Sequence, residues 1–348
     1  MNPLPAGLRR VVVLRALMLG DLLCATPALR ALRAGLPGAR IALVGLPWAR
    51  ELVQRLESLD EFIELPGWPG LPETETAPLA QALGFVATMR QRRWDLALQL
   101  HGSGAVVNPL LASFGARLNA GFAAPGTPRP AADRRRFVAW PEHGSELERL
   151  LVLTDALGLP RRGTQLDFPL FDEDRRRAAA LLGEGRWALV HAGSQLPSRR
   201  WPPERFAAVA DALADSGLQV VLTGSAAEAP LVAALRQKMR QPALDLAGRT
   251  ELWTLGAIVE RAALVVCNDT GISHIAAALG TPSVVVASGS DVARWAPRDA
   301  SRHRVLWHPV PCRPCAHPVC PTEHECAAGV EAAAVRAAAL AALETDHA

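Results

Sequence analysis

The chain alternates short apolar runs with helical patterns, and one such stretch in its second half constrains the fold most. Residues 263–286 contain the runs ALVVC and SVVV on either side of NDTGISHIAAALG, which spans 268–280. Two apolar strands joined by a helix are typical of a parallel sheet covered by helices. The turn at Asn268 then presents backbone N–H groups at the start of a helix, where they can bind an anion.

The turn before this helix suits a phosphate. Thr270 adds a hydroxyl, and Gly271 lets a ligand approach the backbone closely. The alternative is that Asp269 caps the helix, because aspartate is among the preferred N-cap residues and satisfies N–H groups without a ligand. This segment alone leaves both interpretations open.

The same alternation runs through the chain in two series. In the first series, apolar runs predict strands at 11–14, 41–44 and 96–100, with helices at 22–36 and 51–59. In the second series, strands are predicted at 188–191, 219–222, 263–267 and 283–286, with helices at 204–214, 226–239 and 252–262. Segments rich in Pro and Gly predict a long loop at 66–78 and a linker at 158–171.

The length and the two series together predict two domains. With 348 residues, the chain exceeds the roughly 250–300 residues at which single hydrophobic cores stop growing. We expect an α/β fold with two Rossmann-like domains facing each other across a cleft, at 1–165 and 166–328, followed by a C-terminal helix at 329–348. Ligands of such open sheets bind at the carboxyl ends of the strands.

Composition argues against several classes of protein. The formal net charge is only +3, which gives no support for a nucleic-acid-binding protein. No run of about 18 uncharged apolar residues occurs, and Arg15 and Asp21 interrupt the apolar N-terminal stretch, so we expect a cytoplasmic protein without a signal peptide. Lys238 is the only Lys, so Arg clusters are weaker functional evidence in this chain than usual.

The turn LGD after the first strand places Asp21 at the cleft edge of the first domain. Its carboxylate can act as a general base. The position supports this role, because loops at strand ends carry function more often than other segments. The alternative is that Asp21 caps the helix that follows. A helix N-terminus would stabilise the charged carboxylate and so weaken it as a base.

The loop HAGSQLPSRRWPPERF, residues 191–206, has the composition of a diphosphate site. The guanidinium forks of Arg199 and Arg200 match phosphate oxygens, and Ser194 and Ser198 add donors. The alternative is a solvated Arg pair, which contributes little.

The segment TGSAAE places Glu228 on the first turn of the next helix. Its carboxylate can accept hydrogen bonds from ribose hydroxyls. The alternative is that it only interacts favourably with the helix dipole.

Four of the six cysteines lie close together in sequence, at Cys312, Cys315, Cys320 and Cys326. A C-x2-C pair followed by two more thiols is similar to a structural zinc site, although the second pair is spaced more widely than usual. The alternative is that packing orders this Pro-rich segment. Isolated Cys24 and Cys267 lie in apolar runs, which indicates core packing.

Several other nucleotide sites are absent from the sequence. The GxGxxG fingerprint fails after the strand at 96–100, because Val107 stands where the third Gly is needed. No Walker A motif occurs. The acidic string 172–174 precedes three Arg residues and is interpreted as the start of a helix.

Taken together, LGD, HAGS…SRRWP, TGSAAE and NDTGISHIAAALGTP resemble the motifs of glycosyltransferase family 9, the ADP-heptose:lipopolysaccharide heptosyltransferases. The resemblance extends from about residue 11 to 326, and NDTGISHIAAALGTP and RRWP are its most specific parts. It implies a GT-B fold, a donor held mainly by the C-terminal domain, and no essential metal ion or cofactor. The cysteine segment also resembles the tail of many members, which favours a structural trait.

The resemblance also implies roles for individual residues. Asp21 resembles the catalytic base, and Glu228 matches the residue near the donor ribose. Arg199 stands where the family usually has a phosphate-binding Lys, a change from a point charge to a planar fork. The residues that match the diphosphate-binding turn are Asp269, Thr270, Gly271 and His274.

On the acceptor side, the resemblance implies a lipid-linked saccharide at the cytoplasmic face of the inner membrane. The basic residues Arg90, Arg92, Arg93 and 134–136 either contact such an anionic acceptor or form a solvated face. An epimerase or hydrolase of nucleotide sugars, a family 9 transferase using another nucleotide sugar, and a nucleotide-sensing module with a zinc segment remain alternatives.

Overall fold

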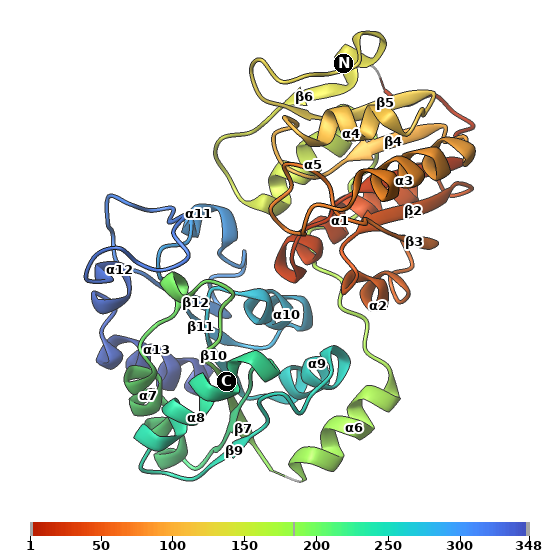
Figure 1. Ribbon diagram of the computed structural model, residues 1–348. Helices are drawn as coiled ribbons and strands as arrows, with labels where there is room; N and C mark the ends of the chain where they lie inside the picture. Colours follow the sequence, from red (N-terminus) through yellow and green to blue (C-terminus); the bar gives the residue numbers. More distant parts are fainter. Residues whose placement is uncertain (1–2, 184, 346–348) are drawn as a thin grey trace. The chain divides into compact units, whose positions relative to one another are not determined.

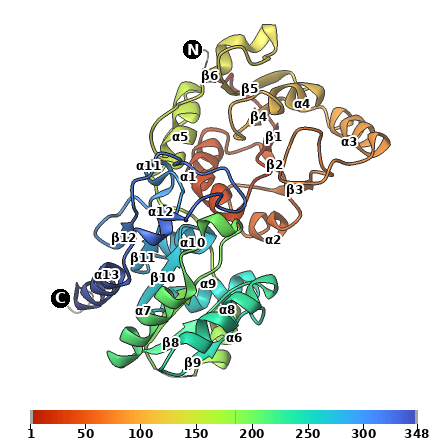
Figure 2. The same ribbon diagram turned by 60° about the vertical axis from the view of Figure 1, so that its left-hand side comes forward.

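The computed structural model describes residues 3–183 and 185–345. The chain divides into two compact units, Met1–Pro169 and Leu170–Ala348. The division falls inside 158–171, the segment in which Pro and Gly interrupt the helical pattern. Each unit contains one parallel sheet with helices on both of its faces (Figures 1 and 2).

The described residues of the first unit form a sheet of six parallel strands in the order β3-β2-β1-β4-β5-β6. The strands are β1 (Arg10–Leu14), β2 (Arg40–Gly45), β3 (Glu61–Glu64), β4 (Leu96–Gln99), β5 (Leu118–Ala123) and β6 (Phe137–Ala139). The helices are α1 (Leu19–Gly35), α2 (Ala49–Val53), α3 (Leu79–Gln91), α4 (Val107–Ser113) and α5 (Glu146–Ala156), with a 3-10 helix at Ala131–Arg136.

The central strand of this sheet is buried on both faces, as parallel strands usually are. On one face, Val12 and Leu14 of β1 join a core cluster with Met89 of α3 and Phe114, which follows α4. Helices α1 and α5 pack against each other on the opposite face (Figure 2). This double cover explains why β1 is a continuous apolar run in the sequence.

The described residues of the second unit form another sheet of six parallel strands, in the order β12-β11-β10-β7-β8-β9. The strands are β7 (Trp187–His191), β8 (Gln219–Leu222), β9 (Ala243–Asp245), β10 (Leu264–Asn268), β11 (Ser283–Val286) and β12 (His303–Leu306). The helices are α6 (Asp172–Leu182), α7 (Pro203–Asp215), α8 (Ala229–Lys238), α9 (Leu252–Arg261), α10 (Gly271–Leu279), α11 (Val292–Trp295), α12 (Glu325–Ala328) and α13 (Ala332–Thr345), with 3-10 helices at Pro197–Arg199 and Ala226–Glu228.

Buried aromatic side chains fix the loops of the second unit to its core. The rings of Trp201 and Phe206 meet edge to face at 4.9 Å between centroids, and both are fully buried. The Trp201 indole N–H donates to the Val330 carbonyl at 2.9 Å. Helix α13 packs on α7 and buries Val335 and Ala339 in the same core.

Both sheets have the same topology, with the fourth strand in chain order pairing with the first. The chain therefore reverses its direction across the sheet between β1 and β4, and again between β7 and β10. Such a switch point opens a crevice at the carboxyl ends of the two strands, where ligands of open α/β sheets bind. A ligand site is therefore expected at the loops that follow these four strands.

The expected α/β class and parallel sheets are confirmed, whereas three helix limits were wrong. Helix α1 begins at Leu19 rather than at residue 22. Helix α2 ends at Val53, because Leu56 and Leu59 are buried through tight turns instead of a helix. The helix expected at 226–239 is divided into a 3-10 turn and α8, which has Pro230 in its first turn.

Two further expectations from the sequence are confirmed. The acidic string begins α6, where the Phe171 backbone N–H donates to the Asp174 carboxylate at 2.8 Å. The segment 66–78 contains neither helix nor strand. In the part of the chain that the structure describes, no helix is long and apolar enough to cross a membrane.

Candidate active site

Asp21 lies in the first turn of α1, the helix that follows β1 after the short connection 15–18. The N-cap of α1 is Met18, so the interpretation of Asp21 as the N-cap is wrong; the helix begins earlier than its apolar pattern. The Asp21 side chain is 21% exposed, and its Oδ1 lies 3.9 Å from Arg15 Nη2. The position after β1 makes the carboxylate accessible at the switch point of the first sheet.

Arg15 is a residue of this site that the sequence analysis missed. Its side chain is fully buried, and its Nη2 donates to Glu146 Oε1 at 3.1 Å. Its Nε donates to the Asp21 carbonyl at 2.8 Å, and its Nη1 donates to the Leu100 carbonyl. One guanidinium thus ties together the ends of β1 and β4 and the starts of α1 and α5, and Glu146 compensates its buried charge.

His101 follows β4 and is also buried, with 6% of its surface exposed. Its Nδ1 accepts a hydrogen bond from the Ala16 backbone N–H at 3.1 Å. Burial, with the charge of Arg15, lowers the pKa of His101 to about 4. At neutral pH the ring is therefore uncharged and carries its proton on Nε2.

The Nε2 atom of His101 faces Glu73, which comes from the loop at 66–78. The distance from Nε2 to Glu73 Oε1 is 4.0 Å. Burial raises the pKa of Glu73, and the nearby Asp21 raises it further, against a hydrogen bond from its own backbone. The first unit therefore has two carboxylates close together at one strand edge.

The sequence carries a signal for His101. The residue comes just after an apolar strand, where the rule for strand ends indicates function, although its segment lacks the GxGxxG motif. Glu73 had no such signal, because a side chain in a long loop is oriented only by tertiary contacts.

In the second unit, the turn after β10 has its N-cap at Thr270, and α10 begins at Gly271. The interpretation of Asp269 as the N-cap is therefore wrong. The Thr270 side chain makes no capping hydrogen bond, and Thr270 and Gly271 are partly exposed. The helix thus begins with N–H groups and a hydroxyl at the surface, an arrangement that suits an anion.

His274 lies one turn into α10 and is 5% exposed. Its ring meets that of Trp295 edge to face, with 6.2 Å between centroids. His274 is therefore a buried residue that packs against α11, whereas Thr270 and Gly271 are partly exposed at the turn.

Asn268, the last residue of β10, connects two loops and is completely buried. Its Oδ1 accepts from the Trp201 backbone N–H at 2.9 Å, and its Nδ2 donates to the Ala192 carbonyl at 2.7 Å. These bonds hold the loop after β7 against the turn after β10. Asn268 was not among the predicted site residues, although it opens the most specific motif.

The Arg pair in the loop after β7 is bonded to backbone carbonyls. Arg200 Nε donates to the carbonyl of buried Ser194 at 2.9 Å, and Arg199 Nη2 donates to the Cys315 carbonyl at 3.1 Å. Arg199 Nε is buried and has no hydrogen-bond partner among the described residues. Within the described part of the chain, neither guanidinium forms a salt bridge with a carboxylate, so their charge is available to an anion.

Glu228 lies beside the same loop. Its Oε2 accepts from the Ser225 backbone N–H at 2.8 Å and from Ser225 Oγ at 2.9 Å. Burial works to raise the pKa of Glu228, but the bonds from Ser225 and the nearby His191 and Arg200 lower it overall. A Cβ on Gly193 would lie 2.2 Å from Glu228 Oε1, so the glycine makes room for this carboxylate.

The cysteine segment packs against the Arg199 loop. The Ser198 N–H donates to the Pro318 carbonyl at 3.1 Å, and the Cys315 N–H donates to the Gly289 carbonyl at 2.7 Å. Cys315 and Cys326 are buried, Cys320 is partly exposed and Cys312 is exposed. Among the described residues, no three His, Cys, Asp or Glu side chains are grouped so as to hold a metal ion.

The remaining cysteines and the basic residues of the first unit differ in their surroundings. Cys24 and Cys267 are buried, as expected of core residues. Two of the basic residues of the first unit form ion pairs: Arg92 with Glu61 at 2.5 Å, and Arg136 with Asp133 at 2.8 Å.

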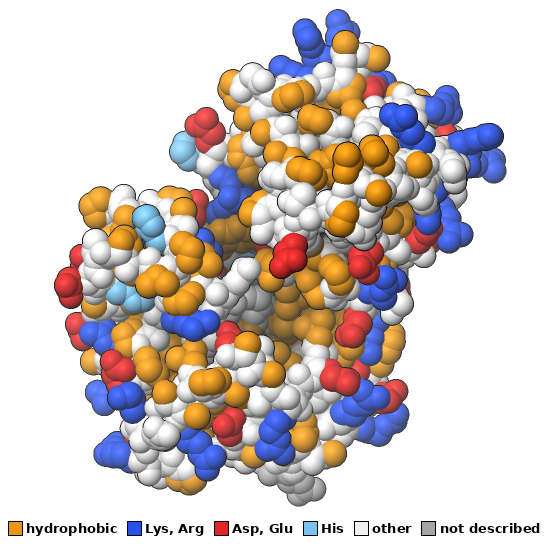
Figure 3. All heavy atoms as spheres, viewed as in Figure 1, with side chains coloured by type: hydrophobic (Ala, Val, Ile, Leu, Met, Phe, Trp, Pro, Cys, Tyr) orange, Lys and Arg blue, Asp and Glu red, His pale blue; other side chains and the backbone are white. Residues whose placement is uncertain are grey.

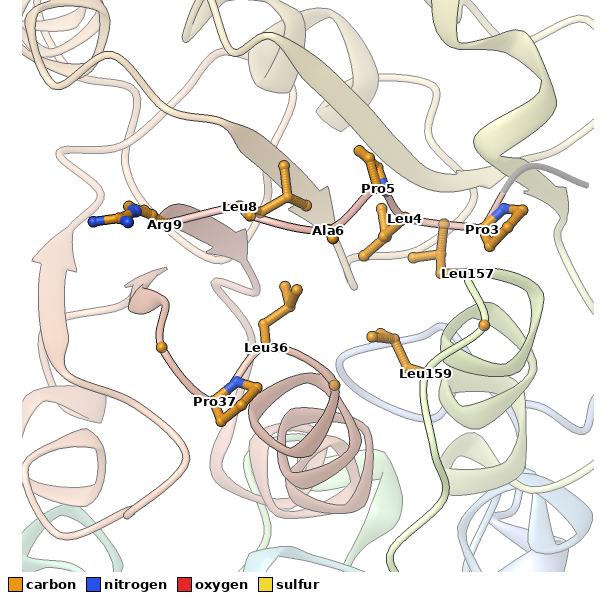
Figure 4. A pocket seen from close by; sticks show the side chains of 14 residues that line it. Pro3, Leu4, Pro5, Ala6, Leu8, Arg9, Leu36, Pro37, Leu157 and Leu159 are labelled. Atoms are coloured by element: carbon orange, nitrogen blue, oxygen red, sulfur yellow. The ribbon is translucent and has the colours of Figure 1, made fainter.

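A cavity of about 640 Å³ lies at the other end of the first sheet (Figure 4). Its lining includes Leu8, Leu36 and Leu159, and it is next to the start of β1. The carboxyl end of β1, where Asp21 lies, is the opposite end of that strand. This cavity is therefore separate from the candidate active site.

The chain is similar to known proteins over most of its length. The model of glycosyltransferase family 9 (heptosyltransferase) matches residues 83–325. Lipopolysaccharide heptosyltransferase 2 of Escherichia coli strain K12 is 28% identical over 80% of this chain and 82% of the relative. Two solved structures have the same fold at lower identity.

The glycosyl transferase family 9 protein of Veillonella parvula superposes with a TM-score of 0.82 at 20% identity, covering 99% of this chain and 100% of that one. The E. coli ADP-heptose lps heptosyltransferase II superposes with a TM-score of 0.75 at 22% identity, covering 98% and 100%. The expected GT-B fold is thereby confirmed. Because the family model matches well over half of the sequence, the chain belongs to glycosyltransferase family 9 and is a glycosyltransferase.

Proposed function

We propose that this enzyme transfers a heptose from ADP-heptose to a saccharide of the lipopolysaccharide core, with inversion and without a metal ion. The observation that carries the proposal is the chemistry at the two switch points. The carboxylate of Asp21 follows a strand of the first sheet. Arg199, Arg200 and the start of α10 follow strands of the second sheet. A base for a hydroxyl and a site for a diphosphate are the two requirements of the reaction.

The second unit holds the donor in this proposal. Negative charge develops on the diphosphate as the bond from the anomeric carbon to ADP breaks. Arg199 and the N–H groups at Thr270 and Gly271 stabilise that charge, and they supply the positive potential that a metal ion provides in other enzymes. Asp269 supports the turn, Ser194 orients Arg200, and Glu228 accepts hydrogen bonds from the ribose.

The first unit supplies the base. Asp21 takes the proton from the attacking acceptor hydroxyl, whose oxygen forms the new bond to the anomeric carbon while ADP leaves. Attack from the side opposite ADP inverts the anomeric configuration. Loss of ADP runs ahead of deprotonation, so the sugar is oxocarbenium-like and a weak base is sufficient.

The proposal includes contact with the cytoplasmic face of the inner membrane, where the acceptor lipid is anchored. Helix α3 supports this part, because Leu79 and Leu83 are 74% and 59% exposed on it. Figure 3 shows hydrophobic side chains over this helix with basic side chains beside them. Exposed Arg90 and Arg93 at the end of α3 complement an anionic lipid surface.

The test is to incubate the protein with ADP-heptose and follow ADP with and without a lipopolysaccharide-core acceptor, in the presence of EDTA. Acceptor-dependent ADP release and a product of inverted anomeric configuration are expected. ADP release that ignores the acceptor would show a hydrolase instead. Turnover only on another nucleotide sugar, or abolished by EDTA, would overturn the donor or the metal-independent mechanism.

A further inference from the structure

The loop at 66–78 is firmly held although it has no helix or strand. Leu71 and Ala77 are buried at 7% and 9% exposure, and Trp68 packs on the core of the first unit. Gly67, at φ +95°, lies so close to the Glu75 carbonyl that a Cβ there would approach it to 2.1 Å. Glu73 lies between the two buried anchors, so its position is set by the fold.

Two polar atoms of this loop have no partner within the described residues. Glu73 Oε2 and Thr74 Oγ1 are buried and form no hydrogen bond there. Leaving a buried acceptor unsatisfied is unfavourable, so such atoms usually mark a ligand or a water site. Glu73 is also the carboxylate close to Asp21.

A gap between His101 and Glu73 completes the arrangement. The 4.0 Å from His101 Nε2 to Glu73 Oε1 is too long for a direct hydrogen bond. His101 accepts at Nδ1 from Ala16, so its Nε2–H is a donor, while Glu73 is an acceptor. A hydroxyl fits between them, because it accepts from one partner and donates to the other.

We propose that His101 and Glu73 form a subsite beside Asp21 for a second hydroxyl of the acceptor sugar, adjacent to the hydroxyl that reacts. This inference rests on the proposed function and specifies its acceptor. The enzyme selects an uncharged sugar ring with two neighbouring hydroxyls at the point of attack.

The charges at this edge of the sheet explain the selection. Asp21 and Glu73 together repel an anionic group such as a sugar carboxylate, and Glu146 already compensates the charge of Arg15. A neutral diol has donors for both carboxylates. One of its hydroxyls can accept from His101 Nε2 and donate to Glu73 at the same time.

The experiment pairs a protein variant with an altered acceptor. The acceptors are a lipopolysaccharide-core saccharide and two synthetic versions lacking one or the other hydroxyl next to the reacting one. For the wild type, we expect one of the deoxy acceptors to lose about 10- to 100-fold in kcat/KM, the value of a hydrogen bond to a charged group. Glu73→Ala should lose the same factor on the full acceptor and nothing more on that deoxy acceptor.

The controls separate a structural effect from recognition. Glu75→Ala, in the same loop but exposed, should leave all three acceptors unchanged. In Glu73→Ala, ADP affinity should be unchanged and the melting temperature should be no lower than in the wild type. Glu73→Gln provides a second variant of nearly the same shape if the alanine variant is unstable.

Equal losses on all acceptors in both Glu73 variants, or no loss on the full acceptor, would overturn the subsite and leave the proposed function standing. Failure of the wild type to transfer heptose from ADP-heptose to any of the three would overturn the proposed function and the subsite with it.

Discussion

The two units have the same strand order but opposite chemistry at the carboxyl ends of their strands. In the first, Asp21 and Glu73 gather near buried His101, and the cation Arg15 is compensated by Glu146. In the second, Arg199 and Arg200 donate to the backbone carbonyls of Cys315 and Ser194, and neither pairs with a carboxylate among the described residues. The fold fixes where the site lies, and the residues after the strands decide what it binds.

The two units differ in the partners of the arginine that lies at the carboxyl ends of their strands, Arg15 in the first and Arg199 in the second. Buried Arg15 donates to Glu146 and to two backbone carbonyls, so it holds structure together. Arg199 has a buried Nε without a partner among the described residues. The first unit thus uses its arginine internally, and the second keeps its own for an anion.

The largest effect is expected from removing the base of the first unit. Asp21→Asn should lower turnover by about 10²- to 10⁴-fold, the usual contribution of a general base. ADP affinity measured by calorimetry should not change, because the proposed donor site is in the second unit. Asp155→Asn, an exposed carboxylate on α5, is the control and should keep full turnover.

Near wild-type turnover in Asp21→Asn would contradict the proposed difference between the two units, because Asp21 of the first unit would then not act as the base. A parallel loss of ADP affinity would instead show that the two units do not divide the substrates.

The buried histidine of the first unit should make that unit sensitive to acid. The pKa of His101 is about 4 when folded and 6.5 when exposed, so the unfolded chain takes up the proton first. The contribution of neutral His101 to the free energy of unfolding is full above pH 6.5 and is lost as the pH drops toward 4, by up to about 3 kcal/mol. Thermal melts from pH 7 to 4.5 should show a shallower fall for His101→Asn, which keeps an acceptor for the Ala16 N–H. An unchanged slope would show that His101 titrates normally.

The positions of the strands were largely predictable from the sequence, because strands buried on both faces leave continuous apolar runs. The predicted site residues Asp21, Arg199 and Glu228 also lie after strands, as their motifs indicated. The N-caps were not predictable: α1 and α10 begin at residues whose apolar pattern does not mark the boundary.

The partners of the site residues were less predictable still. Arg15 looked like a charge that interrupts an apolar run, and its partner Glu146 is 131 residues away. Glu73 lies in a loop whose course depends on where Leu71 and Ala77 are buried. Such long-range pairs leave no periodic signal in a single sequence.

The cation of the second unit should contribute to donor binding. Arg199→Ala should weaken ADP binding by about 1.5–3 kcal/mol, the value of hydrogen bonds to charged groups. Arg199→Lys should recover only part of this loss, because a point charge replaces a planar fork. Calorimetry with ADP measures both, and Arg236→Ala, exposed on α8, is the control. Unchanged affinity in Arg199→Ala would make the second unit resemble the first, with a purely structural arginine.

The smallest effect concerns Glu228 in the second unit, whose carboxylate accepts a hydrogen bond from the Ser225 hydroxyl. Ser225→Ala removes one of the two hydrogen bonds to Glu228 Oε2, and the loss of ADP affinity should be about 0.5–1.5 kcal/mol. If Glu228 binds a ribose hydroxyl, the loss should vanish with either 2′-deoxy-ADP or 3′-deoxy-ADP, whichever lacks that hydroxyl. An equal loss with ADP and both analogues would show that Glu228 only stabilises the turn. In that case carboxylates would bind substrate hydroxyls in the first unit and not in the second, so the two units would differ in this respect as well.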